Sequence, residues 1–321
     1  MCHQGARRAH HVLGIERQRG KGGARSRLLG ALEMGGTKMV CATGRADGEI
    51  VERVRIDTAD PTSTLEACGA WFAERGVEAL GVGAFGPTDV DPALPHFGCM
   101  LTTPKPGWSN VDVLGALRSV IDVPVGYDTD VNAACLGEAV YGCARGLRDV
   151  LYLTIGTGVG AGVLVEGNLL HGAMHPEAGH IPLTRDPADP MPSGVSACPF
   201  HTNCLEGLAC GPSLWKRWGD PVAAGMADDP GKVALIGGYL GQALATFVLC
   251  YMPRKIVIGG GVGDHLPLLP PARIKLAELL NGYLAIPEMD DLDAYVVGNS
   301  LDGDQGILGC LELARRALGE N

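Results

Sequence analysis

Residues 28–44 read LLGALEMGGTKMVCATG and predict the first structural unit of the chain. An apolar run leads into two adjacent glycines, and a second apolar run follows, which is typical of a strand, a tight turn and a second strand. Residues 149–170, DVLYLTIGTGVGAGVLVEGNLL, repeat this layout with different letters. A chain that twice begins a strand–glycine turn–strand unit is most simply built as two α/β halves.

Turn signals and hydrophobic spacing predict the neighbouring elements. Asp47-Gly48 indicates a hairpin turn before a strand over 50–56, and Thr62 or Ser63 could cap a helix over 62–75. The remaining elements are expected, in chain order, as a strand over 78–87, a helix near 111–120, a strand over 123–128, a helix over 131–142, a long helix over 232–252, a strand over 255–261 and a helix near 307–318.

Composition limits the class of protein. The chain has 321 residues, of which 46% are hydrophobic, so two domains are expected. No uninterrupted apolar run approaches the roughly 18 residues of a membrane span, which argues against a membrane protein. The net charge of −10 argues against nucleic acid as a partner. Eleven cysteines without a signal peptide favour the cytoplasm, and residues 1–27 are expected to be a disordered basic arm.

Three glycine-rich turns follow apolar strands. They are Gly35-Gly36-Thr37-Lys38, Gly156-Thr157-Gly158 and Gly259-Gly260-Gly261. Backbone N–H groups at such turns can bind phosphate, although each turn alone could be a simple β-turn. Gly30 and Gly35 have the spacing of a P-loop, but the order that follows is Gly-Thr-Lys rather than Gly-Lys-Thr. The three turns together favour phosphate binding.

The motifs GALEMGGTK, GAFGPTD, TPKPGW, DTDVNAACLGE, LTIGTGVGAG, HPEAGH, CPFHTNCLEGLACGP and KIVIGGGV occur in this order. Over residues 28–318 the sequence resembles the ROK family of sugar kinases in the actin-like ATPase superfamily, and within it the zinc-containing bacterial fructokinases. The resemblance implies an α/β fold with two domains around a central cleft. Residues 28–127 would form a small domain, closed by a helix at about 306–319, and residues 128–305 a large domain with the zinc loop.

The resemblance implies ATP-dependent phosphorylation of a hexose, D-fructose to fructose 6-phosphate, with Mg²⁺. Mannose, glucose or an N-acetyl amino sugar are alternative substrates, and a sugar-responsive transcription regulator is a different class that the short arm does not favour. Because dimers are common in the family, a homodimer is expected. The first two turns would face the ATP phosphates, while Gly259, Gly260 and Gly261, with Gly211, would flank the adenosine.

Asp130 matches the general base of the family. The helix that begins there should keep its carboxyl ionised, although an aspartate at this position is also a common helix N-cap. Many relatives have asparagine at the position of Thr129, whereas a threonine here matches the fructokinase branch. Asp128 could be the cap or a partner of the site. The resemblance places Gly86, Asn132, Glu177 and Glu206 near the sugar.

Cysteine and histidine gather in one short loop. Cys198, His201 and Cys204 lie within seven residues, and His180 would complete the four ligands of a tetrahedral structural zinc, as the resemblance implies. A chance cluster of buried cysteines is the alternative, and His180 could instead contact sugar. The proline-rich spacer over 181–197 is expected to loop out without moving the ligands.

Overall fold

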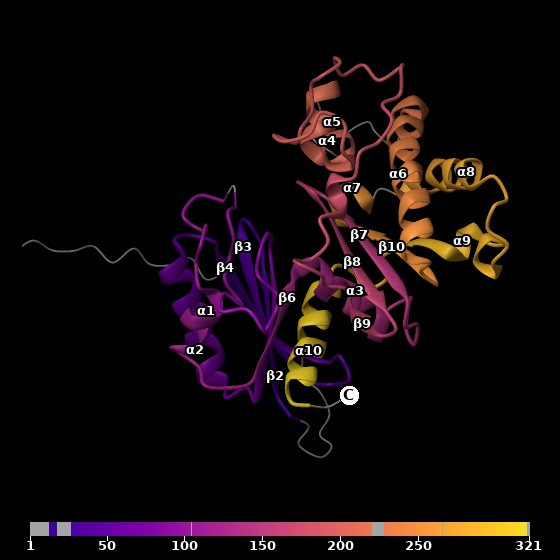
Figure 1. Cartoon of the computed structure of the whole chain (residues 1–321). Helices are drawn as coiled ribbons and strands as arrows, with labels where there is room; N and C mark the ends of the chain where they lie inside the picture. The colour runs from indigo at the N-terminus through magenta and orange to yellow at the C-terminus, as the bar shows by residue number, and fades with distance from the viewer. Residues whose placement is uncertain (1–12, 18–26, 104, 220–227, 265, 320–321) are drawn as a thin grey trace, which may run out of the picture. The chain divides into compact units, whose positions relative to one another are not determined.

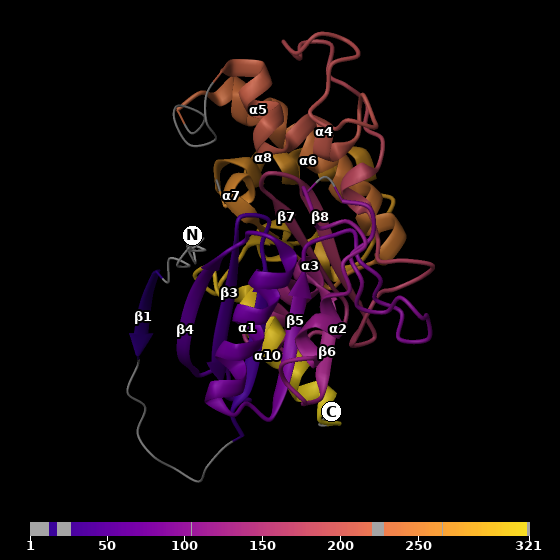
Figure 2. The same cartoon turned by 90° about the vertical axis from the view of Figure 1, so that its left-hand side faces the viewer.

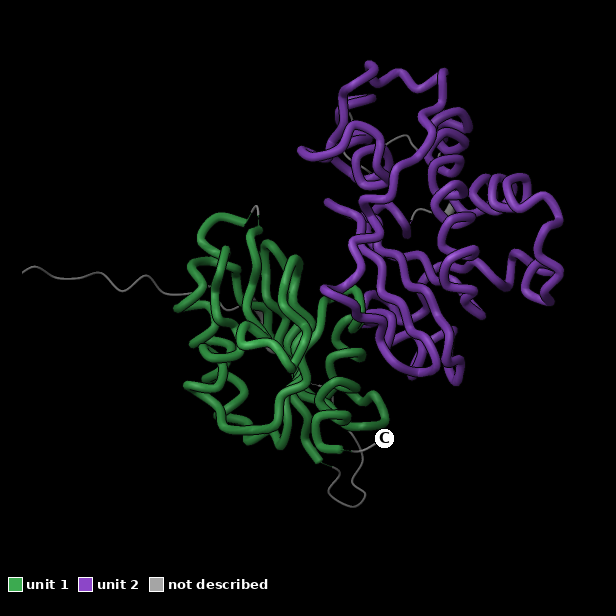
Figure 3. The backbone as a smooth tube through the Cα atoms, viewed as in Figure 1, with its two compact units in different colours: residues 1–133, 306–321 green, residues 134–305 purple. Residues whose placement is uncertain are grey.

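The computed structural model describes residues 13–17, 27–103, 105–219, 228–264 and 266–319. The chain divides into two compact units (Figure 3). Unit 1 contains residues 1–133 and 306–321, and unit 2 contains residues 134–305. Each unit is built on one mixed β-sheet, as the repeated strand–turn–strand layout predicts.

The sheet of unit 1 has the strand order β1-β4-β3-β2-β5-β6. The first four strands of this order pair antiparallel, whereas β2, β5 and β6 run parallel to one another. The strands are β1 (Leu13–Arg17), β2 (Leu29–Met34), β3 (Lys38–Gly44), β4 (Ile50–Asp57), β5 (Ala79–Ala84) and β6 (Val125–Thr129).

Helices cover both faces of this sheet (Figure 2). On one face Phe72 of α1 (Pro61–Arg75) lies against Gly30 of β2, and α2 (Val113–Arg118) packs beside α1. On the other face Leu311 of α10 (Gln305–Ala317) lies against Gly44 of β3. Unit 1 therefore needs the last helix of the chain to cover its sheet.

The cap of α1 differs from the prediction. Asp60, rather than Thr62 or Ser63, is the N-cap, and its carboxylate accepts a hydrogen bond from the Ser63 N–H at 3.0 Å. Pro61 can begin the helix because the first helical N–H needs no partner inside the helix. The helix thus begins one residue earlier than expected.

The arm over 1–27 was expected to be disordered, and most of it lies outside the described residues. Within it, Leu13–Arg17 forms β1, which pairs antiparallel with β4. Without β1, β4 would be the edge of the sheet and would present unpaired backbone groups that can accept another strand. The prediction of an unstructured arm is therefore wrong for these five residues.

The sheet of unit 2 has the order β11-β10-β7-β8-β9. Here β7, β10 and β11 are parallel, while β8 and β9 continue from β7 as antiparallel hairpins. The strands are β7 (Val150–Ile155), β8 (Val159–Val165), β9 (Asn168–Leu169), β10 (Lys255–Gly259) and β11 (Val296–Gly298).

The largest helix of unit 2 is α6 (Pro230–Tyr251), which lies beside α8 (Leu269–Leu280) (Figure 1). By length and composition α6 could cross a membrane, but 61% of its most apolar window is buried, as in the core helix of a globular unit. The other α-helices of unit 2 are α4 (Leu205–Ala209), α5 (Gly211–Trp218), α7 (Gly260–Gly263) and α9 (Leu292–Tyr295). Three 3₁₀ turns lie at Ala178–His180, Leu266–Leu268 and Pro287–Met289. Helix α3 (Asp130–Val140) begins in unit 1 and continues into unit 2.

The spacer over 181–197 leaves the four ligands in one cluster, as expected, but it is also anchored to the neighbouring helices. Asp189 forms a bidentate ion pair with Arg217 of α5, with both N–O distances 2.8 Å and both side chains fully buried. Tyr239 of α6 donates a hydrogen bond to the same carboxylate at 2.7 Å. Arg185 binds four backbone carbonyl groups of the spacer and the cysteine–histidine loop. These contacts hold the spacer against α5 and α6.

Candidate active site and metal centre

Asp130 is the first residue of α3 and directly follows β6. Its Oδ1 accepts a hydrogen bond from the Val131 N–H at 2.8 Å. The capping contact is made by Thr129, whose Oγ1 accepts from the Asn132 N–H at 3.1 Å. The N-cap role considered for Asp130 therefore belongs to Thr129, and the Asp130 carboxyl is available for chemistry.

Burial raises the pKa of Asp130 to about 6, although hydrogen bonds from the Val131 and Asp130 backbone N–H groups act to lower it. The helix terminus was expected to dominate and to keep the carboxyl ionised. Removal of the carboxyl from water is the larger effect, because burial penalises the charged form. A carboxyl with this pKa remains mostly ionised at neutral pH and is basic enough to accept a proton.

Asp128 fixes the side chain of Asn132 in the first turn of α3. The buried Asp128 Oδ1 accepts from the Thr129 N–H at 2.8 Å and from the Asn132 side-chain amide at 2.6 Å. Asp128 is therefore a partner of the predicted sugar-binding Asn132 and not the cap of α3.

Predicted site residues of unit 1 meet at one edge of its sheet. Strands β2, β5 and β6 are parallel neighbours, so their carboxyl ends lie at the same edge. The Gly35–Lys38 turn follows β2, the exposed Gly86 follows β5, and Asp130 follows β6. This edge is where ligands bind in open α/β sheets.

The Gly35–Lys38 turn has a partner that the sequence reasoning did not assign. The Gly35 N–H donates to the Lys38 carbonyl at 3.0 Å, and the Thr58 hydroxyl donates to the Gly35 carbonyl at 2.8 Å. The ammonium of Lys105 donates to the Gly36 carbonyl. Lys105 is the lysine of the TPKPGW motif. That motif is the feature of the sequence from which a cation beside this turn could have been expected.

The other two glycine turns meet in unit 2. Gly156–Gly158 follows β7, and Gly259 ends the parallel neighbour β10, with Gly260 and Gly261 directly after it. The Gly211 N–H donates to the Gly156 carbonyl at 2.8 Å. Gly260 has φ of 85°, and a Cβ there would lie 2.5 Å from Thr154 Oγ1, so this turn requires glycine. Four predicted nucleotide-binding segments are thus divided between the two units, one in unit 1 and three in unit 2.

The four predicted metal ligands form one cluster. One ligand atom from each of His180, Cys198, His201 and Cys204 lies within 4.8 Å of the other three. Cys198 Sγ is 3.7 Å from His180 Nδ1 and 3.5 Å from His201 Nδ1, and Cys204 Sγ is 3.7 Å from His180 Nδ1. Zinc bonds of about 2.3 Å to sulfur and about 2.0 Å to nitrogen place tetrahedral ligands roughly 3.5 to 3.8 Å apart. The residues therefore fit Zn²⁺.

The chemistry of the cluster supports the same fit. Burial raises the pKa of the Cys204 thiol to about 11, so a cation is needed to hold the thiolate at neutral pH. His180 directs Nδ1 toward the sulfur atoms, while its Nε2 lies 3.9 Å from Glu177 Oε2. Glu177 therefore places a negative charge near the far side of the His180 ring, at a distance longer than a hydrogen bond. Glu177 also lies 3.6 Å from His175 Nδ1.

Glu206 connects the metal loop with a glycine turn. It is the second residue of α4, two positions after the Cys204 cap, and its Oε2 accepts from the Val159 N–H at 3.1 Å. Its carboxylate therefore contacts the end of the Gly156–Gly158 turn.

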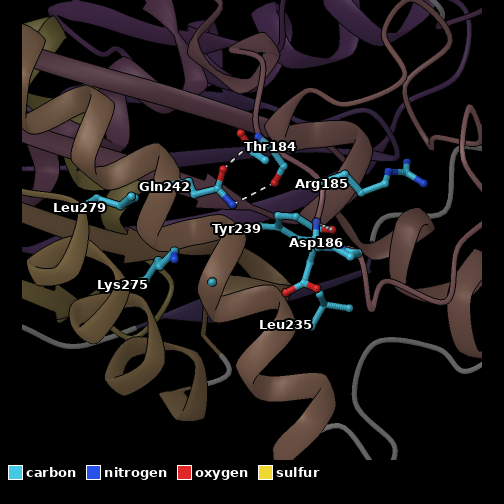
Figure 4. A pocket seen from close by; sticks show the side chains of 10 residues that line it. Thr184, Arg185, Asp186, Leu235, Tyr239, Gln242, Lys275 and Leu279 are labelled. Atoms are coloured by element: carbon cyan, nitrogen blue, oxygen red, sulfur yellow. Dashed lines mark hydrogen bonds between the residues drawn. The ribbon is translucent and has the colours of Figure 1, made fainter.

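A cavity of about 330 Å³ lies elsewhere in unit 2 (Figure 4). It is lined by the spacer at residues 184–187 and by side chains of α6 and α8, and none of the predicted site residues is among them. The Gln242 amide is already hydrogen-bonded to both the N–H and the carbonyl of Thr184, at 2.9 and 3.0 Å. The cavity is therefore separate from the candidate site.

Comparison with known proteins identifies the family. The ROK family model matches residues 29–317. The fructokinase of Pediococcus pentosaceus is 43% identical over 291 residues, which is 91% of this chain and 99% of the relative. The fructokinase of Streptococcus mutans is 37% identical over 295 residues, 91% of this chain and 98% of the relative.

A solved structure agrees with these relatives. The ROK family glucokinase from Streptomyces griseus, in complex with glucose and AMPPNP, matches with a TM-score of 0.70 and 25% identity. The match covers 90% of this chain and 99% of the glucokinase. The chain belongs to the ROK family and has the actin-like ATPase fold of two α/β domains.

Proposed function

We propose that this protein is an ATP-dependent fructokinase, which converts D-fructose to fructose 6-phosphate. The fructokinases that match nine-tenths of the chain support fructose as the hexose. The observation that carries the chemistry is Asp130, a carboxyl with a pKa raised to about 6 by burial, at the carboxyl end of β6. It is the proton acceptor that phosphoryl transfer to an alcohol requires.

Asp130 accepts the proton of the fructose 6-hydroxyl as the oxygen of that hydroxyl attacks the terminal phosphorus of ATP. The bond from this phosphorus to the oxygen that bridges it to the β-phosphate breaks, and ADP leaves with that oxygen. Gly86, Asn132, Glu177 and Glu206 contribute to binding the sugar, and Asp128 orients the Asn132 amide for this role. Such a base commonly contributes about 100- to 10,000-fold in rate.

The glycine turns bind ATP. The backbone N–H groups of Gly35–Lys38 and Gly156–Gly158 bind the phosphates, since exposed amides favour anions. Lys105 and Lys38 place cations at the first of these turns. Gly211 and Gly259–Gly261 flank the adenosine. Mg²⁺ bound to the phosphates supplies positive charge that offsets the charge of the transferring group.

His180, Cys198, His201 and Cys204 hold a structural Zn²⁺. A zinc bound by four protein side chains has no open position for substrate, so its contribution is to stability rather than to the reaction. The donor set and the 3.5 to 3.7 Å spacing support this assignment.

The protein acts in the cytoplasm, where ATP and reducing conditions are available. Its cysteines are free thiols throughout the described residues, which suits such a compartment. A homodimer also stays a proposal, and light scattering coupled to size-exclusion chromatography tests it.

A coupled assay of ADP release tests the substrate. Purified protein is supplied with Mg-ATP and with fructose, mannose, glucose or N-acetylmannosamine, each over a range of concentrations. We expect the highest kcat/KM with fructose. A higher kcat/KM with another hexose would replace fructose as the substrate, and ADP release that no sugar stimulates would contradict the kinase assignment.

A further inference from the structure

The same sulfur atom that would bind the metal also caps α4. Cys204 is the N-cap of this helix, and its Sγ accepts a hydrogen bond from the Gly207 N–H at 3.3 Å. The ligand cluster and the start of α4 therefore share one side-chain atom, so the position of Cys204 Sγ fixes both.

Backbone contacts fix the same segment against the rest of the metal loop. The Leu205 N–H donates to the Ile181 carbonyl at 3.1 Å, one residue after the ligand His180. The Leu183 N–H donates to the Asn203 carbonyl at 2.8 Å. The two ligand-bearing segments are thus paired directly beside His180 and Cys204, so neither can move alone.

Glu206 in α4 and Gly211 at the start of α5 each contact the Gly156–Gly158 turn or the residue that follows it. Glu206 Oε2 accepts from the Val159 N–H at 3.1 Å, and a Cβ on Gly158 would lie only 2.8 Å from the same oxygen. After α4 ends, the Gly211 N–H donates to the Gly156 carbonyl at 2.8 Å. Of these two contacts, only that of Glu206 is made by a side chain and can be removed by substitution.

We propose that Glu206 is a positioning residue for the Gly156–Gly158 turn, and that through it the metal loop supports nucleotide binding. This inference rests on the proposed role of the turn in binding ATP phosphates. It differs from a role of Glu206 in sugar binding alone, because it predicts an effect on ATP affinity when no sugar is present.

The test measures binding of a non-hydrolysable ATP analogue with Mg²⁺ by calorimetry, without sugar, in the zinc-loaded full-length protein. Glu206→Ala removes the contact, and we expect the Kd for the analogue to rise about tenfold, the effect of one charge-assisted hydrogen bond. Glu206→Gln keeps an oxygen that can accept from Val159, and we expect a Kd within about threefold of wild type. Zinc content should stay equal in all proteins.

Glu278→Ala is the matched control, because it removes an equal charge from unit 2 where Glu278 pairs with Lys275 on α8. It should leave the Kd unchanged. The inference is overturned if Glu206→Ala binds the analogue like wild type, if Glu206→Gln is as weak as Glu206→Ala, or if Glu206→Ala loses zinc. Wild-type protein that neither binds ATP nor phosphorylates fructose would instead contradict the proposed function.

Discussion

Two opposing effects act on the carboxyl group of Asp130. Its position in the first turn of α3 favours the charged form, and its removal from water favours the neutral form. The second effect is larger, and the pKa lies at about 6. The resemblance to the ROK family implies Asp130 as the base, a role that stays a prediction, and the sequence could not predict the direction of the pKa shift. Burial of a carboxyl depends on segments that are distant in sequence.

The pKa of Asp130 predicts how the reaction depends on pH. The base must be unprotonated to accept a proton, so kcat/KM for fructose should fall about tenfold per pH unit below about pH 6. Above pH 7 this group should cause no further increase. A pH–rate profile in buffers of constant ionic strength measures the effect, and a profile without a transition between pH 5 and about 7 would contradict the base role of a group with this pKa.

Asp130→Asn should lower kcat by about 100- to 10,000-fold and should stabilise the protein. The folded-state pKa is raised above the ordinary value of 3.8, so the folded protein holds more protons between about pH 4 and about pH 6. The contribution of this carboxyl to stability therefore falls as the pH rises through that interval. At pH 7 the substitution removes the free-energy cost of burying the charged Asp130 carboxyl, which is roughly 1–3 kcal/mol. Urea unfolding at pH 7 measures it, and a less stable variant would contradict the explanation.

At the scale of elements, the metal loop and its spacer show what a sequence pattern can and cannot predict. Ligand types and spacing predicted that Cys198, His201 and Cys204 belong together, because those residues are chemically distinctive, and the resemblance to the ROK family added His180. The anchoring of the spacer was missed, because Asp189 finds its partners Arg217 and Tyr239 far along the chain. No local pattern relates three residues that are 28 and 50 positions apart.

Zinc removal should destabilise unit 2 first. A strong chelator, or Cys198→Ser, should release about one Zn²⁺ per chain and lower the melting temperature. Hydrogen exchange should then increase most over residues 178–211, which contain the ligands and α4. Cys250→Ser is the control, because Cys250 is exposed and outside the cluster. Carefully purified protein without zinc would contradict the assignment.

The buried Asp189–Arg217 ion pair should contribute strongly to stability once formed. Arg217→Met leaves the Asp189 carboxylate buried without its cation, and we expect a loss of about 3–5 kcal/mol in the free energy of unfolding. Combining it with Asp189→Leu should recover part of that loss, since no charge remains buried. Arg254→Met, which breaks the more exposed pair with Glu288, should cost about 0–1 kcal/mol. Equal losses for Arg217→Met and Arg254→Met would contradict the expectation.

At the scale of the whole molecule, the sequence predicted two α/β halves because each half opens with the same strand–turn–strand pattern. The placement of the last helix in unit 1 came from the resemblance to the ROK family, since nothing in the local pattern of residues 305–317 says which sheet they cover. Strand β1 was not predicted, because its pairing depends on the edge of β4 and not on its own sequence.

Removal of residues 1–26 should leave catalysis intact. The family match begins at residue 29, and β1 pairs with β4 alone at the edge of the sheet. The charged residues Glu52, Arg53 and Arg55 on β4 should keep the uncovered edge from pairing with other chains. We expect kcat and KM within about twofold of the full chain and a single species by light scattering. A large loss of turnover would show that the arm takes part in the reaction.

The participation of α10 in unit 1 has a consequence for how the polypeptide is made. Residues 134–305 are continuous, so every segment of unit 2 has been synthesised before the last 16 residues are added. The first 133 residues of unit 1 are translated earlier than unit 2. One face of the unit 1 sheet nevertheless stays uncovered until residues 306–317 have been synthesised and can pack on it. A premature stop codon that removes only residues 306–321 would therefore destabilise unit 1, although the rest of that unit is synthesised first.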